Sequence, residues 1–156
     1  MATNQNSDSE MERQLTHVIF TYFAAIDDKQ LSLALYKRLF AASCAIVRPN
    51  GATTTGPSAI YESQHESFKR FRATQHTVTN MLFHKAETDW HLRANVQAMH
   101  LWNPELQDPT ALESYFLAHS VLSARFIEEA GDWKIAELGI KVVWRSGSGM
   151  MAMLKT

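Results

Sequence analysis

The sequence has little of what would assign it to several common classes of protein. Its 156 residues include a single cysteine, Cys44, which excludes an internal disulfide framework and a zinc site built from thiolates. The 15 Lys and Arg are balanced by 16 Asp and Glu, so the chain lacks the basic excess of a nucleic-acid or anionic-membrane surface. No apolar run approaches the roughly 18–20 residues that span a bilayer. We therefore expect a soluble, cytoplasmic protein with neither nucleic-acid nor membrane partners.

Against these absences stand a large apolar fraction and many histidines. Hydrophobic residues make up 46% of the chain, enough for one core, and the length suits one compact domain. Residues 1–9 are polar and lack a signal-peptide pattern, so they are predicted to be a disordered tail before a single domain over residues 10–146. Residues 147–156 are a predicted tail with a Met-rich end that is a candidate lid. The seven histidines outnumber the six glycines and the four prolines, and they are the candidates for chemistry.

Hydrophobic periodicity divides the chain into a helical part and a part made of strands. Apolar residues recur at helical spacing over 10–26, over 31–40 and again after Pro57, and a short strand over 44–48 separates the second and third helices. After Arg72 the period changes to two, which predicts four long strands over the ranges 74–86, 91–102, 112–129 and 133–145. The predicted fold is therefore α+β, with three N-terminal helices packed on a strongly bent antiparallel sheet in the order α-α-β-α-β-β-β-β.

This order of elements, together with several short segments, resembles the NTF2-like superfamily of cone-shaped barrels and in particular its SnoaL-like branch. The segments that carry the resemblance are Tyr22–Asp27 (YFAAID), Gly56–Ile60 (GPSAI), Thr74–Asn80 (TQHTVTN) and Gly131–Glu137 (GDWKIAE) with Val142–Arg145 (VVWR). The resemblance covers about residues 10–146 and implies a cone closed by helices. The fold hosts dehydratases, isomerases, hydrolases, oxygenase subunits and non-enzymatic modules, so it does not define one activity.

Within that superfamily the pattern is similar to scytalone dehydratase and related lyases. Those enzymes place a Tyr and an Asp on the first helical hairpin, a His at the start of the first long strand and a further polar group on the next strand. The resemblance thus implies that Tyr22, Asp27, His76 and His100 are the catalytic residues. It is incomplete at the first short strand, where scytalone dehydratase has a second Tyr and this chain has Ile-Val-Arg.

Strand parity independently places two histidines on one wall of the predicted cone. In the strand 91–102, the residues that share a face with His100 are apolar, which indicates an inward face. If the hairpin before this strand turns near Thr88-Asp89, His76 lies directly opposite His100 across it. The remaining residues that we assign to the substrate cavity are Phe23, Tyr61, Asn80, Trp102 and His119.

These residue types suit acid–base chemistry at neutral pH. An imidazole can remove the α-proton of a β-hydroxy carbonyl compound while another protonates the leaving hydroxyl. We predict His76 as the base and His100, paired with Asp27, as the acid, or the reverse, with Tyr22 polarising the carbonyl. The predicted protein is a dehydratase or isomerase without cofactor or metal, acting on a small apolar oxygenated ring compound such as a polyketide or a steroid-like molecule.

Two other functions remain open at this point. Asp27, His76 and His100 have the composition of a non-haem iron site, namely two histidines and one carboxylate. The chain could also be a non-catalytic ligand-binding or structural module, like the small subunit of a ring-hydroxylating oxygenase. A cone filled by Trp and Met would favour such a module, whereas convergence of the four catalytic candidates in a pocket would favour an enzyme.

Apolar residues on the outer face of the sheet predict self-association. A broad exposed apolar face is typical of an interface between subunits, so we expect a homodimer, with a trimer as the alternative. The residues assigned by parity to this outer face are Phe83, Met99, Leu101, Phe116 and Phe126.

Overall fold

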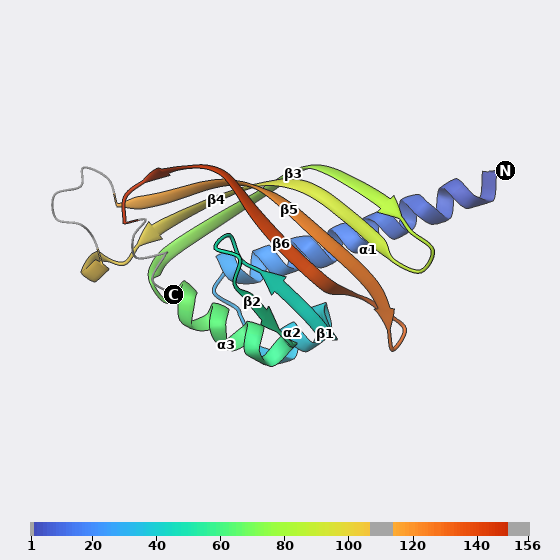
Figure 1. Cartoon of the computed structure of the whole chain (residues 1–156), viewed down its shortest axis with the longest axis horizontal. Helices are drawn as coiled ribbons and strands as arrows, with labels where there is room; N and C mark the ends of the chain where they lie inside the picture. Colours follow the sequence, from blue (N-terminus) through green and yellow to red (C-terminus); the bar gives the residue numbers. More distant parts are fainter. Residues whose placement is uncertain (1, 107–113, 150–156) are drawn as a thin grey trace.

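The computed structural model, which describes residues 2–106 and 114–149, confirms the predicted α+β fold with three helices and a strongly bent sheet (Figure 1). The helices are α1 (Ala2–Asp27), α2 (Leu33–Leu39) and α3 (Pro57–Phe68). The strands are β1 (Phe40–Val47), β2 (Thr53–Thr55), β3 (Phe71–Lys85), β4 (Trp90–Trp102), β5 (Tyr115–Glu129) and β6 (Asp132–Gly147). No helix in this described part is long and apolar enough to cross a membrane.

The six strands form one open sheet in the order β2-β1-β6-β5-β4-β3. The long strands β3 to β6 are joined as antiparallel neighbours, but β1 pairs with β6 in parallel. The prediction of a wholly antiparallel sheet is therefore wrong at this pair. Hydrophobic alternation reports which face of a strand is buried and carries no information about the direction of its partner.

Helix α1 is longer than its apolar stripe indicated. It begins at Ala2, so residues 2–9 are helical and the predicted disordered tail is wrong. The sequence before Asp27 contains no Gly or Pro to stop a helix, and Asp8 accepts a hydrogen bond from Lys85 at 3.0 Å. At the other end of the chain, β6 runs on to Gly147, and residues 150–156, with the predicted lid, lie outside the described residues.

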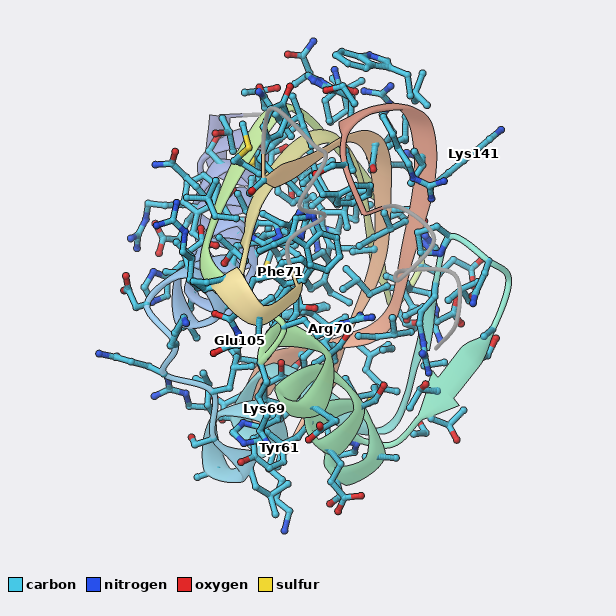
Figure 2. The ribbon with its side chains drawn as sticks, turned by 90° about the vertical axis from the view of Figure 1, so that its left-hand side faces the viewer. Tyr61, Lys69, Arg70, Phe71, Glu105 and Lys141 are labelled. Atoms are coloured by element: carbon cyan, nitrogen blue, oxygen red, sulfur yellow. The ribbon has the colours of Figure 1, made fainter. Side chains whose placement is uncertain are left out.

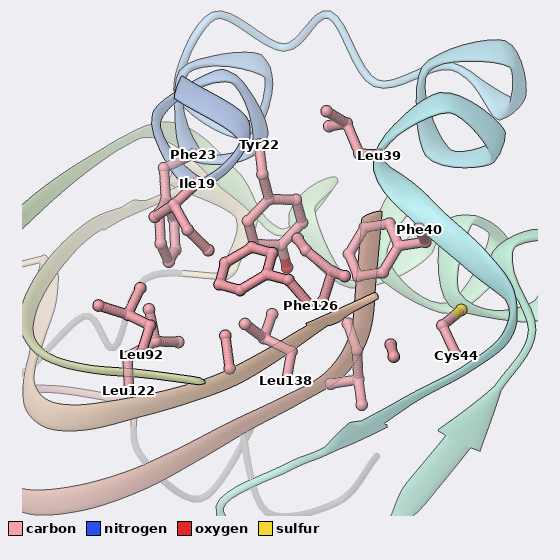
Figure 3. Close-up of a cluster of buried hydrophobic side chains, with 14 of the residues drawn as sticks. Ile19, Tyr22, Phe23, Leu39, Phe40, Cys44, Leu92, Leu122, Phe126 and Leu138 are labelled. Carbon is pink, nitrogen blue, oxygen red and sulfur yellow. The ribbon is translucent and has the colours of Figure 1, made fainter. Parts of the chain in front are cut away.

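The main core lies between α1 and the concave face of the long strands (Figure 3). Leu15, Ile19 and Phe23 form part of one buried stripe on α1, spaced by four residues so that they stack on one side of the helix. They face the inner side chains of β4 and β5, among which Leu92 and Leu122 are almost fully buried. This packing fixes α1 across the sheet and thereby fixes the position of its C-terminal end.

The buried face of β5 is the opposite of the one predicted. Phe116 and Phe126 are 3% and 0% exposed, so their assignment to the outer face is wrong. Both faces of β5 are rich in apolar residues, and alternation alone could not choose between them. The choice is made by the register with β4, which places Ala118 opposite the inward-facing Ala98. Phe83 was assigned to the outer face too, but it lies opposite the buried Leu92 and packs against the core. The predicted homodimer loses these three residues from its proposed surface and stays a prediction.

Two leucines give a matched test of this core. We expect Leu122→Ala to lower the free energy of unfolding by about 2–5 kcal/mol, because it removes a fully buried side chain and leaves a cavity. The same substitution at Leu82, which is 66% exposed, should lower the free energy of unfolding by less than about 0.5 kcal/mol. Urea denaturation followed by tryptophan fluorescence measures both variants, and equal losses would contradict the packing described.

Candidate active site

A cavity of about 210 Å³ lies between the concave face of the sheet, the C-terminal part of α1 and helix α3. Its lining combines apolar side chains with a few polar groups, and it includes both His76 from β3 and His100 from β4. Neither Trp nor Met is among the described residues that line it. The space is thus an apolar chamber with a small number of polar groups, which is the usual make-up of a small-molecule site.

A group of hydrogen bonds beside this cavity joins the end of α1 to β3. The Asp27 carboxylate contacts the Nδ1 atom of His76 at 2.7 Å and accepts the backbone N–H of the same residue at 2.8 Å. The hydroxyl of Thr74 donates a third hydrogen bond to this carboxylate at 2.8 Å. Close to these contacts, Lys29, just after the end of α1, donates a hydrogen bond from Nζ to the carbonyl of Phe71, the first residue of β3, at 3.0 Å.

These contacts decide the charge of Asp27. Burial acts to raise the pKa of this carboxyl, but the hydrogen bonds from His76 and Thr74 outweigh burial, and the pKa lies below its ordinary value. A carboxylate at the C-terminal end of a helix is disfavoured by the helix dipole, and the three donors offset that cost. Asp27 is therefore ionised at neutral pH and acts as an acceptor.

Because the Asp27 carboxylate can only accept a hydrogen bond, it determines which nitrogen of the His76 imidazole carries the hydrogen. Nδ1 donates to Asp27, so Nε2, on the other side of the ring, carries the lone pair in the neutral form. The ring stacks on Phe23 with 4.8 Å between centroids and an interplanar angle of 27°, and its side chain is 6% exposed. His76 is thus an oriented, mostly buried imidazole on the cavity wall, and Asp27 occupies its Nδ1 rather than its Nε2.

His100 lies beside His76 but in a different environment. The two rings are 5.7 Å apart and nearly perpendicular, and His100 Nδ1 donates to the carbonyl oxygen of Phe116 at 3.2 Å. Burial lowers the pKa of His100 to about 4, and the neighbouring His76 adds to this effect. His100 is therefore neutral at pH 7. The structure pairs Asp27 with His76 rather than with His100, which does not support a role for His100 as an imidazolium acid.

The register between β3 and β4 differs from the predicted one by a two-residue offset. Thr74 lies opposite His100, and His76 lies opposite Ala98, so the two histidines are diagonal neighbours on the same face. One residue of this offset arises at the turn, where Lys85 pairs with Trp90. The other arises at a register shift in β3 beside Asn80, which has φ +51° and is exposed. Asn80 was predicted to contact substrate, and the structure instead places it at this irregularity, away from the cavity.

Tyr22 is buried behind the cavity wall. Its hydroxyl accepts a hydrogen bond from the amide nitrogen of Gln64 at 2.6 Å, and the amide oxygen of Gln64 accepts one from Tyr36 at 2.5 Å. Burial raises the pKa of Tyr22, so this hydroxyl stays protonated. Gln64 lines the cavity and Tyr22 does not, so the predicted direct contact of Tyr22 with a carbonyl gives way to a contact through Gln64.

Three further residues predicted to bind substrate lie away from the cavity, whereas Phe23 does line it. The ring of Tyr61 packs against that of Tyr36, with 5.6 Å between the ring centroids. Trp102 belongs to a second small core and donates a hydrogen bond to the Ser148 carbonyl at 2.9 Å. His119 lies on the outer face of β5, and its ring stacks on that of Trp144 with 3.7 Å between the ring centroids.

Sequence reasoning missed one cavity residue because of a β-bulge. Along β6, Val142 lies opposite Ser120 and Trp144 lies opposite His119, with Val143 as the additional residue. This bulge turns Trp144 outward and brings Arg145 to the cavity, against simple alternation. Arg48 and Arg70 also line the cavity, and neither spacing nor parity pointed to them. Among the described residues, no group of three or more His, Cys, Asp or Glu could hold a metal ion.

The titration of His100 can be measured directly. Its folded pKa of about 4 lies below the ordinary value of 6.5, so the unfolded chain binds more protons between these values. The contribution of neutral His100 to the free energy of unfolding is fully present above pH 6.5. It falls by about 3 kcal/mol as the pH is lowered towards 4. Urea denaturation at a series of pH values should show this slope in the wild type and a weaker one in His100→Gln. An NMR titration of His100 with a midpoint near 6.5 would contradict the buried, neutral state.

Comparison with solved structures places this architecture among known ones. The chain is similar to the Kfla4162 protein of Kribbella flavida, with a TM-score of 0.80, 18% identity, and coverage of 89% of this chain and 95% of that one. It is also similar to a "Putative Scytalone Dehydratase" of Novosphingobium aromaticivorans, with a TM-score of 0.79, 18% identity, and coverage of 93% and 92%. A third similar structure is a hexachlorocyclohexane dehydrochlorinase (LinA), with a TM-score of 0.74, 11% identity, and coverage of 96% and 94%. At these identities the likeness shows the fold alone.

Comparison with sequences is decisive at the level of the family. A search of curated proteins gave no match. The family model described as "SnoaL-like domain" matches residues 7–139, which is most of the chain and includes Asp27, His76 and His100. The chain therefore belongs to the SnoaL-like domain family.

Proposed function

We propose that this protein is a cofactor-independent lyase or isomerase that removes a proton from the carbon beside a carbonyl group. The observation that carries this proposal is the Asp27–His76 pair, with a 2.7 Å contact, at the wall of an apolar cavity. An ionised carboxylate that accepts the Nδ1 hydrogen leaves Nε2 as the base and stabilises the imidazolium that forms after proton transfer. The low polarity of the lining strengthens this electrostatic contribution.

In a dehydration, one imidazole can serve both proton transfers. His76 Nε2 takes the α-proton of a β-hydroxy ketone, and the electron pair of that C–H bond moves towards the carbonyl as an enolate. The enolate then forms the carbon–carbon double bond as the C–O bond breaks, and the imidazolium returns its proton to the departing hydroxyl. The products are an enone and water, and His76 is restored to its neutral form. An isomerisation would use the same first step and return the proton to a different carbon.

Gln64 is suited to the carbonyl oxygen of the substrate. Its amide nitrogen has two hydrogens, and one of them is donated to Tyr22. The hydrogen bond from Tyr36 to the amide oxygen fixes the orientation of the group. The second N–H is then a preorganised donor on the cavity wall, where it would stabilise a developing enolate.

Two of the similar structures support this class of reaction. Their names describe a dehydratase and a dehydrochlorinase, and both reactions eliminate a leaving group together with a proton. A base next to an apolar chamber is the common requirement of such eliminations. We therefore extend the reaction class, and not the substrate, to this chain.

The size of the cavity favours a small substrate. A cavity of about 150 Å³ holds one benzene molecule, and the chamber here measures about 210 Å³. One substituted ring fits this space better than the four fused rings of a steroid. Of the substrates suggested by the sequence, a ring of polyketide type is therefore the better match.

Solvent exchange tests the proposed base without knowledge of the natural substrate. In D₂O, the wild type should exchange the α-protons of cyclic β-hydroxy ketones, with and without a ring carboxylate, and convert them to enones. His76→Gln and Asp27→Asn should each slow exchange at least about 100-fold, because they remove the base or the group that orients it. ¹H NMR follows both the exchange and the loss of water.

The control for this experiment is His84→Gln. His84 is an exposed histidine on the same strand, so its loss should leave exchange unchanged. Circular dichroism would verify that all variants are folded. Wild-type rates in a folded His76→Gln variant would overturn the proposed function.

A further inference from the structure

One row of side chains crosses the floor of the cavity from β3 to β6. His76 lies opposite Ala98, Ala98 lies opposite Ala118, and Ala118 lies opposite Arg145. All four residues line the cavity. The row therefore joins the proposed base at one end to a guanidinium at the other through two alanines.

The two alanines leave room for a ligand between these ends. Neighbouring strands lie about 4.8 Å apart, so the three steps from β3 to β6 separate the two end residues by about 14 Å along the sheet. The rows on either side carry larger groups and form the walls of a trough. They are the row Val78, Val96, Ser120 and Val142 and the row Thr74, His100 and Phe116.

Apart from the region around His76, the charged residues on the cavity wall are all positive. Arg48, Arg70 and Arg145 line the cavity, and no Asp or Glu is among its described lining residues. Arg48 and Arg145 also border a surface groove that continues outward past Lys141, again without a described acidic residue. A concave, low-dielectric surface of one charge sign focuses its field and attracts ligands of the opposite sign.

Two of these arginines are held by neighbouring polar atoms. Arg48 donates to the Thr54 hydroxyl at 2.7 Å. Arg70, at the junction of α3 and β3 (Figure 2), donates to the backbone oxygen of Ser67 at 3.0 Å and to its hydroxyl at 2.7 Å. Both side chains are thus fixed on the wall, and Arg145 lies on the floor row with His76.

We propose that the substrate is a ring compound that carries a carboxylate, and that Arg145 binds this group while His76 acts on the opposite side of the ring. This inference rests on the proposed function and names its substrate class. A planar guanidinium forms paired hydrogen bonds with a carboxylate. The Asp27 carboxylate contacts His76, so a carboxylate on the substrate is repelled from that end of the cavity and attracted to the other.

A matched pair of ligands isolates the charge. The probes are 4-oxocyclohexanecarboxylate and its methyl ester, which share a ring and exchangeable α-protons but differ in charge. Isothermal titration calorimetry should show that the wild type binds the acid at least about ten-fold more tightly than the ester. In Arg145→Gln this preference should fall to less than about two-fold, and in Arg145→Lys it should be intermediate, because a charge remains without the planar pair of donors.

Arg93→Gln is the control with the same substitution and the same change of charge. Arg93 is exposed, lies on β4 opposite Ser123, and lines neither the cavity nor the groove beside it. Its loss should leave the preference for the acid intact, since Arg93 lies on the outer face of the sheet. Thermal denaturation would establish that each variant is folded, and Arg145→Lys keeps the test open if Arg145→Gln does not fold.

The outcomes separate this inference from the proposed function. Equal binding of acid and ester by the wild type, no binding of the acid in the millimolar range, or a preference that survives in both folded Arg145 variants would overturn the inference. Exchange of the α-protons in D₂O, lost in His76→Gln, tests the proposed function separately. If the wild type prefers the acid but does not exchange α-protons, the anion site is retained and the proposed function is rejected. If it exchanges α-protons but does not prefer the acid, the proposed function is retained and the anion site is rejected.

Discussion

The carboxylate of Asp27 is the constraint on which the rest of the site depends. It ends α1 and accepts hydrogen bonds from Thr74 and from the backbone and ring of His76, all on β3. A helix that ends in an uncompensated carboxylate beside an apolar chamber would be costly, so the three donors make this end of α1 specific to one position on the sheet. The same contacts fix which nitrogen of His76 carries hydrogen. The same contacts therefore hold α1 on the sheet and orient the imidazole of His76. A substitution that weakens the packing of α1 against β3 would also disturb this orientation.

The neighbouring imidazole shows how strongly position determines chemistry in this cavity. His76 and His100 have adjacent rings, yet one is bound to a carboxylate and the other to a backbone carbonyl. Burial among Phe68, Phe71 and Phe116 leaves His100 neutral, with its pKa lowered to about 4. A neutral ring beside His76 adds no competing positive charge there. Two residues that are equivalent by type and strand parity thus have different roles, which only their hydrogen-bond partners distinguish.

The sequence was informative wherever one local period determined the outcome. The apolar stripe of α1, the buried face of β4 and the convergence of Asp27, His76 and His100 all follow from spacing, parity and family resemblance. What could not be predicted depends on pairing between strands. The inward face of β5 is set by its register with β4, and the register of β3 shifts beside Asn80. Arg145 reaches the cavity only because a bulge adds one residue to β6. The bulge in β6 leaves little trace in a hydrophobic pattern, because Val142, Val143 and Trp144 are all apolar.

The bulge in β6 also explains why the two ends of the cavity floor differ in charge. If residues 142–145 alternated regularly without a bulge, Trp144 would face inward and Arg145 outward, and an indole would enter the trough above Ala98 and Ala118. With the bulge, Trp144 stacks on His119 outside the sheet and the floor stays open. The bulge thus keeps the indole out of the cavity and places the cation at the far end of the floor. Since Asp27 holds the negative charge at the near end, the chamber has a direction, and a polar ring compound bound in it would be oriented by the field before any contact with His76 is made.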